Sequence, residues 1–121
     1  MKESEIQTAV RIAMGKEPDL VLWRNSGGVA EKEGRTQRFG LQVGASDLVG
    51  IGPGGVFVAW ELKSATGRLS DEQRRFLALV EKRGGHSAVI RSVDDAWAAL
   101  RVMREAARRA ELGPDAVSDG E

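Results

Sequence analysis

The stretch from 52 to 63 limits the fold of this chain more than any other part of it. A strong turn signal, GPGG at 52–55, precedes VFVAWELK at 56–63, which reads as a strand. Residues two apart on a strand share a face. One face therefore carries Val56, Val58, Trp60 and Leu62, and the other carries Phe57, Ala59, Glu61 and Lys63. We predict a hairpin in which this strand pairs with a strand over 47–51.

The strand ends in two charged residues on one face, Glu61 and Lys63. Burying either charge without a partner costs several kcal/mol. One interpretation is that the strand emerges into solvent and the two form a modest exposed ion pair. The other is that the pair belongs to a functional site, and the register of the hairpin bears on this choice.

A three-residue loop of Pro53-Gly54-Gly55, with Gly55 left-handed, would pair Gly52 with Val56 and bring Asp47 opposite Glu61. A two-residue loop would instead place Asp47 opposite Trp60, on the other face. Opposed carboxylates repel unless a cation lies between them. Oxygen ligands, in a chain with no cysteine and one histidine, favour Mg²⁺ or Mn²⁺. The pattern thus predicts a metal site that activates water against a phosphodiester, with Lys63 holding the water or stabilising charge.

Other periodicities predict three helices and further strands around this hairpin. The helices are expected over 5–15, from 70 to the Gly84-Gly85 stop, and over 93–112. Capping residues are expected at Ser4 with Gln7, at Ser70 with Gln73, and at Ser92. Strands are expected over 20–24 and 87–91, an extended segment over 39–43, and a long polar loop over 25–38. The order α-β-β-β-α-β-α predicts an α/β fold with a mixed sheet flanked by helices.

The length of 121 residues fits one domain, expected over 1–112, with a disordered tail over 113–121. Trp60 and Trp97 are expected in the core, as is Trp23, for which a stacking role stays open. The lone histidine, His86, is interpreted as structural, with a marginal DNA contact as the alternative. Gly40 and Gly44 are expected to permit tight backbone geometry.

The composition excludes several classes of protein. Without cysteine there is no disulfide, thiolate metal site or cysteine nucleophile, which fits a cytoplasmic setting, and without tyrosine there is no tyrosine nucleophile. No apolar run spans a bilayer and the first residues show no signal-peptide pattern, so a protein that is not exported is expected. The net charge of zero counts mildly against a nucleic-acid protein. Residues 63–91, however, hold seven bases against three acids, a local excess suited to phosphate.

Several strings together resemble the VRR-NUC domain of the PD-(D/E)xK nuclease superfamily. They are GASDLVG at 44–50, Glu61-Leu62-Lys63, GRLS at 67–70 with Gln73, Arg24-Asn25, and the Gly-Gly pair before the last strand. The resemblance runs from the first helix to about Leu100, and Ser46 stands where the superfamily has proline. It implies a restriction-endonuclease-like core, α-β-β-β-α-β with a mixed central sheet flanked by helices, plus a C-terminal helix. Standalone domains of this kind are commonly viral.

The resemblance also implies roles. Asp47 and Glu61 match the family's metal ligands, and the carbonyl of Leu62 matches a third ligand. Lys63 matches the catalytic lysine. Gln73 matches a glutamine that points into the site, although a capping box with Ser70 is the competing role. Glu5 matches an acid that approaches the metal, or else is a favourable charge at a helix N-terminus. Candidate phosphate contacts are Arg24, Arg35, Arg38 and Arg68.

The leading hypothesis is an Mg²⁺-dependent (or Mn²⁺-dependent) endonuclease that hydrolyses phosphodiester bonds in branched DNA. By resemblance it would leave 5′-phosphate and 3′-hydroxyl ends and act in DNA repair or recombination. Symmetric cutting of a Holliday junction needs two active sites, which implies a homodimer. No membrane and no nucleotide cofactor are expected. The alternatives are a nuclease for flaps or single-stranded ends, a non-cleaving DNA-binding module, and a structural domain.

Overall fold

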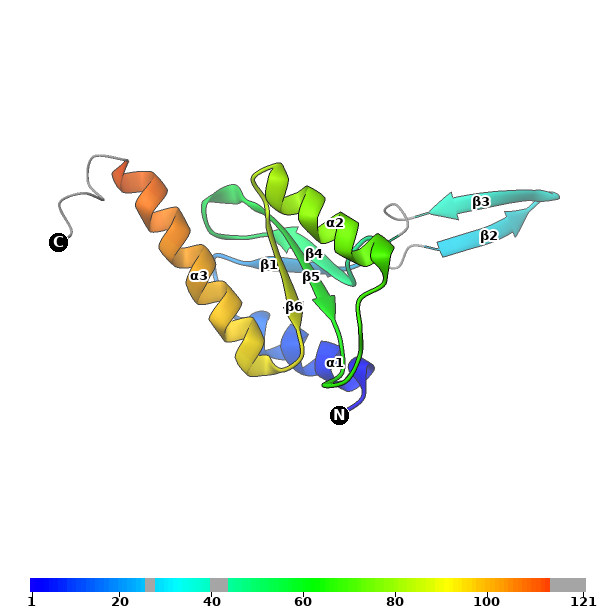
Figure 1. The fold of residues 1–121 in the computed structure, drawn as a ribbon, viewed down its shortest axis with the longest axis horizontal. Helices are drawn as coiled ribbons and strands as arrows, with labels where there is room; N and C mark the ends of the chain where they lie inside the picture. The colour runs from blue at the N-terminus through cyan, green and yellow to red at the C-terminus, as the bar shows by residue number, and fades with distance from the viewer. Residues whose placement is uncertain (26–27, 40–43, 114–121) are drawn as a thin grey trace.

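The computed structural model describes residues 1–25, 28–39 and 44–113. Side chains are described at all of these positions except 28–32 and 36–39. Its elements are α1 (Glu3–Met14), β1 (Val21–Arg24), β2 (Gly28–Lys32), β3 (Arg35–Phe39), β4 (Leu48–Ile51), the 3₁₀ turn η1 (Pro53–Gly55), β5 (Phe57–Leu62), α2 (Asp71–Lys82), β6 (His86–Ile90) and α3 (Val93–Leu112). Four strands form a sheet in the order β1-β4-β5-β6, antiparallel except between β5 and β6. The helix α2 lies on one side of this sheet and α1 on the other (Figure 1). The predicted mixed α/β fold is confirmed.

The turn between β4 and β5 has the predicted three-residue form. Gly52 donates its N–H to the carbonyl of Val56 at 2.8 Å, and Gly55 is left-handed with φ 80°. Leu48 is paired with Trp60. One position beyond that pair come Asp47 and Glu61, so the predicted register is confirmed.

Side chains from the two faces of the sheet enter two separate cores. Val58, Trp60 and Leu62 join the buried residues of α1 and α3. Ala59 joins Phe76 and its neighbours on α2. Glu61 lies on the same face of β5 as Ala59, so its carboxylate is held beneath α2 at the end of the strand.

Gly50 is required for the close approach of β1 to β4. A Cβ at this position would lie 1.8 Å from the carbonyl oxygen of Val21, which no rearrangement short of separating the strands relieves. Gly44 meets a similar limit, because a Cβ there would lie 2.6 Å from the backbone of Glu72 at the start of α2, and its φ is 87°. The expectation of tight geometry at Gly44 is confirmed, whereas Gly40 lies outside the described residues.

The region 25–38, predicted as a loop, instead contains the hairpin β2–β3, which projects away from the sheet (Figure 1). Lys32 pairs with Arg35 across a two-residue turn of Glu33 and Gly34, whose φ values are 54° and 74°. Positive φ at both positions suits the right-handed twist of a hairpin. The sequence did not predict this turn because Glu33 stands where such turns usually have asparagine or aspartate. The two strands also lack the alternation of apolar and polar residues that predicts a strand. Of the extended segment expected over 39–43, Phe39 ends β3 and 40–43 lie outside the described residues.

The helix ends differ little from those predicted, apart from the start of α1. That helix begins at Glu3 rather than Glu5, and its start is capped by the Glu5 carboxylate, which accepts the Lys2 N–H at 2.7 Å. The predicted capping box of Ser4 and Gln7 is therefore incorrect. Ser70 and Ser92 cap α2 and α3 as predicted.

Two of the three tryptophans are not core residues. Trp60 is fully buried, as predicted, but Trp23 is 50% exposed and Trp97 37% exposed. Trp23 lies on the edge strand β1, on a part of the sheet face that α2 does not cover, and Trp97 lies beside the buried stripe of α3. No helix in the described ranges has the length and apolar character needed to cross a bilayer. The predicted tail falls almost wholly in 114–121, outside the described residues.

Candidate metal and catalytic site

Three carboxylates meet where β4 begins and β5 ends. Asp47 directly precedes β4, Glu61 is the penultimate residue of β5, and Glu3 lies in the first turn of α1. One oxygen from each lies within 4.8 Å of the others, so a single cation can contact all three. Hard divalent ions such as Mg²⁺ and Mn²⁺ prefer this donor set.

Glu61 is buried, with 1% of its surface exposed. Its Oε2 accepts a hydrogen bond from Gln73 Nε2 at 2.9 Å and lies 3.8 Å from Lys63 Nζ. Its Oε1 is buried without a partner among the described residues. Burial first, and then the Asp47 carboxylate, raise the pKa of Glu61 to about 8. A buried acceptor left unpaired is costly. A cation between Glu61 and Asp47 would give this oxygen a partner and would offset the repulsion that raises the pKa of Glu61.

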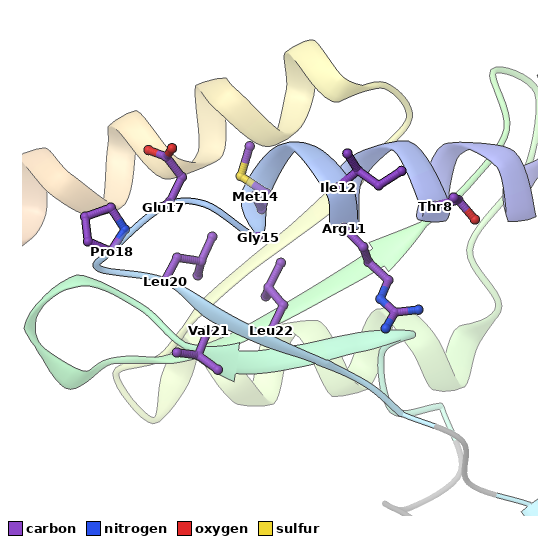
Figure 2. Close-up of a pocket in the computed structure, with 10 residues that line it drawn as sticks. All are labelled: Thr8, Arg11, Ile12, Met14, Gly15, Glu17, Pro18, Leu20, Val21 and Leu22. Atoms are coloured by element: carbon purple, nitrogen blue, oxygen red, sulfur yellow. The ribbon is translucent and has the colours of Figure 1, made fainter.

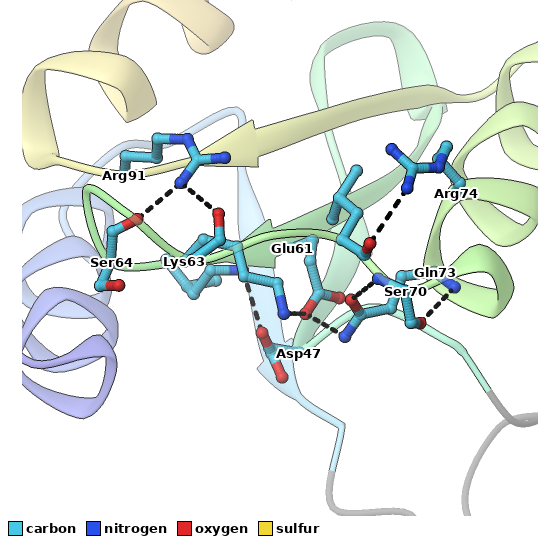
Figure 3. A network of polar contacts seen from close by, with 11 residues as sticks. Asp47, Glu61, Lys63, Ser64, Ser70, Gln73, Arg74 and Arg91 are labelled. Carbon is cyan, nitrogen blue, oxygen red and sulfur yellow. Dashed lines mark hydrogen bonds and ion pairs between the residues drawn. The ribbon is translucent and has the colours of Figure 1, made fainter.

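Asp47 is held in place by backbone contacts. Its Oδ2 accepts the Leu62 N–H at 2.9 Å, which ties the start of β4 to the end of β5 (Figure 3). Its own carbonyl accepts the Asn25 N–H at 2.8 Å, and the Asn25 side chain donates to the carbonyl of Ser46 at 3.2 Å. Ser46 is itself fully buried. The carboxylate position is therefore fixed by three segments of the chain.

Gln73 both caps α2 and contacts Glu61, the two roles that the sequence analysis gave as alternatives. Its Oε1 accepts the Ser70 N–H at 2.9 Å, while its backbone N–H donates to Ser70 Oγ at 3.1 Å, which completes the capping box. The amide nitrogen of the same side chain donates to Glu61 (Figure 3). One amide supplies an acceptor to the cap and a donor to the site, so the two roles do not exclude each other.

The loop between Lys63 and α2 is held by Arg91, which the sequence analysis did not single out. Its Nη1 donates to the carbonyls of Ser64 at 2.6 Å and Gly67 at 2.8 Å (Figure 3). A Cβ at Gly67 would lie 3.3 Å from the Lys63 Cδ, so glycine leaves room for the lysine chain. An arginine directly after the apolar run Ala88-Val89-Ile90, whose last residue is buried, was the available signal, since its charge needs partners there.

The structure places Glu3, and not Glu5, in the acidic cluster. Glu3 precedes Ile6 by three residues and Val10 by seven, so it continues the buried stripe of α1 toward the sheet. Glu5 lies off that stripe and caps the helix instead. The stripe spacing in the sequence was the signal that could have identified Glu3.

The predicted phosphate contacts are spread around this site. Arg24 ends β1 and Arg68 lies in the loop after Lys63, and both are exposed. Arg35 is exposed at the tip of the β2–β3 hairpin, and the side chain of Arg38 lies outside the described residues. The Leu62 N–H contacts Asp47, and the role expected of its carbonyl stays a prediction.

Two hollows lie away from the acids. One, of about 560 Å³, lies between α1 and β1 and is lined mainly by apolar groups and by Arg11 and Glu17 (Figure 2). The other, of about 490 Å³, lies beside α3 and is lined in part by Met103 and His86. Burial lowers the pKa of His86, and its Nε2 has no partner among the described residues. His86 is not a member of the acidic cluster.

The helix-flanked mixed sheet, with its acids at the junction of β4 and β5, defines a restriction-endonuclease-like core. The model of the VRR-NUC domain matches residues 5–94, which is most of the chain. The chain belongs to the VRR-NUC domain family, a family of nucleases. No curated protein and no solved structure gave a match.

Proposed function

We propose that this chain is an Mg²⁺-dependent endonuclease that hydrolyses phosphodiester bonds in DNA, with its site at Asp47, Glu61 and Lys63. The observation that carries the proposal is the buried Oε1 of Glu61, which has no partner among the residues that the structure describes, beside the carboxylates of Asp47 and Glu3. These three acids would hold the ion, with the Leu62 carbonyl as a further ligand. Mn²⁺ suits the same donors.

A bound divalent ion would supply an activated water molecule and would neutralise charge on the scissile phosphate. The protein residues then have separate tasks. Lys63, whose ammonium group lies beside Glu61, positions the attacking water or stabilises the negative charge that develops on the phosphoryl oxygens. Gln73 keeps Glu61 oriented through its hydrogen bond. Arg24 and Arg68 bind the flanking phosphates, together with Arg35 and Arg38 on the hairpin.

Branched DNA is the proposed substrate, and the Holliday junction in particular. Cutting a four-way junction symmetrically takes two active sites, and the described part of this chain holds one acidic cluster, so the proposal includes a two-fold homodimer. A nuclease for flaps or single-stranded ends would use the same residues. A non-cleaving module of the same fold would be expected to lack a ligand, whereas Asp47, Glu61 and Lys63 are all present.

A panel of labelled substrates tests this proposal. Four-way junction, flap and linear duplex are incubated with the protein in Mg²⁺ and in EDTA. We expect paired cuts in the junction that require Mg²⁺, leaving 5′-phosphate ends. Faster cutting of the flap would favour the second candidate, and the absence of Mg²⁺-dependent cleavage on all three would overturn the proposal.

A further inference from the structure

Part of the sheet face beside α2 carries exposed apolar side chains and is not covered by any of the described helices. The helix α2 packs on β5 and β6, and among the described residues no helix packs on the edge strand β1 or its neighbour β4 on this side. Val21 pairs with Ile51, and Ile51 with Phe57, so the three form one row across the sheet. They are 52%, 48% and 43% exposed. Large apolar side chains are thus aligned where a soluble sheet normally carries polar ones.

A second row extends this surface toward the acids. Trp23, 50% exposed, pairs with Val49, which pairs with the buried Ala59. The third row is Asp47 and Glu61, one position beyond Leu48 and Trp60 in the register. We call Val21, Trp23, Ile51 and Phe57 the apolar rows. They share a face with the candidate site and begin two residues from it along the strands.

We propose that the apolar rows are the surface through which two copies of this chain associate. This inference rests on the proposed function, which requires two active sites. The rows hold no charged residue, so a two-fold axis through them brings no like charges together. DNA as the occupant would require cations there, and the rows offer none.

The size of the surface also fits a second copy. Half of an aromatic side chain is roughly 100 Å², so the four half-exposed side chains offer on the order of 350 Å² of apolar area. A standard interface buries about 800 Å² on each partner, of which roughly 450 Å² is apolar. The apolar rows would therefore supply most of the apolar part, and the polar rim would come from their surroundings.

The association has a consequence for catalysis. Asp47 lies four residues from Ile51 along β4, which is about 13 Å at the rise of a strand. A two-fold axis near Ile51 would therefore place both acidic clusters close to the interface, where one branched DNA can reach the two. Paired cutting would depend on the apolar rows, whereas a single cut would not.

The oligomeric state in solution, measured by light scattering during gel filtration, tests the inference. We expect a dimer for the unmodified chain at micromolar concentration. Ile51→Lys should raise the dissociation constant at least about tenfold. Ile12→Lys is the matched control, because Ile12 is 68% exposed on α1, away from the rows, and this variant should remain dimeric. If Ile51→Lys does not fold, Val21→Lys replaces it, and circular dichroism checks the fold of each variant.

A monomeric unmodified chain, or a dimer that withstands both Ile51→Lys and Val21→Lys, would overturn the inference. DNA cleavage assays distinguish a failure of this inference from a failure of the proposed function. Monomeric Ile51→Lys should still nick DNA with Mg²⁺ but lose paired cuts in a junction. If the unmodified dimer cuts no DNA at all, the interface stands and the proposed function fails.

Discussion

The side-chain amide of Gln73 donates to Glu61 Oε2 at 2.9 Å while its oxygen accepts the backbone N–H of Ser70. The start of α2 is thereby connected directly to the buried acid on β5. The capping box fixes the position of the amide oxygen, and this in turn aims the amide nitrogen at the carboxylate. Folding of α2 and orientation of Glu61 therefore depend on the same side chain.

Substitutions at Gln73 should separate these two roles. Gln73→Glu keeps an oxygen for the Ser70 N–H, and so keeps the capping box, but turns a donor into a further acceptor facing Glu61, so cleavage should fall about 10–100-fold. Ser70→Ala is the control, since it loses the cap at about 1 kcal/mol and leaves the contact with Glu61. Thermal unfolding and cleavage rates measure the two effects. Equal losses of cleavage in the two variants would contradict the separation.

Glu61→Gln should stabilise the protein when no metal is present. The folded pKa of Glu61 is raised to about 8 from 4.5, so between these values the folded state keeps a proton that the unfolded state releases. Stability is therefore lost as pH rises from 4.5 to 8, and the glutamine variant avoids this loss. At pH 8 in EDTA we expect its Tm to be higher by at least about 4 °C, the effect of roughly 1 kcal/mol.

The same pair of proteins should respond oppositely to metal. At 100 times the dissociation constant, Mg²⁺ stabilises a protein by about 2.7 kcal/mol, so the Tm of the unmodified chain should rise while that of Glu61→Gln should not. At pH 4.5 in EDTA the two should unfold together. A Tm advantage for Glu61→Gln that is constant from pH 4.5 to 8 would show that the effect is unrelated to the ionisation of this acid.

Glu3 and Glu5 provide a matched comparison on one helix. Because Glu3 lies in the acidic cluster, Glu3→Gln should weaken Mg²⁺ binding about tenfold, as measured by calorimetry. Glu5→Gln should leave Mg²⁺ affinity unchanged and reduce stability by less than about 1 kcal/mol, since a glutamine oxygen can still cap the Lys2 N–H. Weaker binding in Glu5→Gln alone would support the role that the family resemblance gave to Glu5.

Arg91→Lys should slow cleavage without unfolding the chain. Arg91 Nη1 donates to the carbonyls of both Ser64 and Gly67, and the shorter lysine side chain does not bring its nitrogen to the same place. The loop that follows Lys63 would loosen, and we expect about a tenfold lower rate. Arg74→Lys is the control, because the exposed Arg74 side chain donates to the carbonyl of Leu69 and lies 3.9 Å from Asp71, and neither contact involves the two carbonyls that Arg91 holds. Equal rates in the two variants would count against a positioning role for Arg91.

The hairpin register could be predicted because glycine and proline leave few choices for a three-residue turn. That register alone placed Asp47 opposite Glu61, and the family resemblance supplied Gln73. The β2–β3 hairpin could not be predicted, since its strands lack apolar alternation and do not depend on the core for their pairing. Trp23 was misassigned because burial was inferred from residue type, whereas the extent of α2 decides which part of the sheet is covered.

The central claim is that the acids around Glu61 form the site of an Mg²⁺-dependent nuclease. Its most direct test is the rate of DNA cleavage by Glu61→Gln beside Glu5→Gln, at one Mg²⁺ concentration and with EDTA controls. We predict that Glu61→Gln is slower than the unmodified chain by at least about 100-fold, that Glu5→Gln is unchanged, and that EDTA stops every active protein. Unimpaired cleavage by Glu61→Gln, or cleavage that continues in EDTA, would contradict the claim.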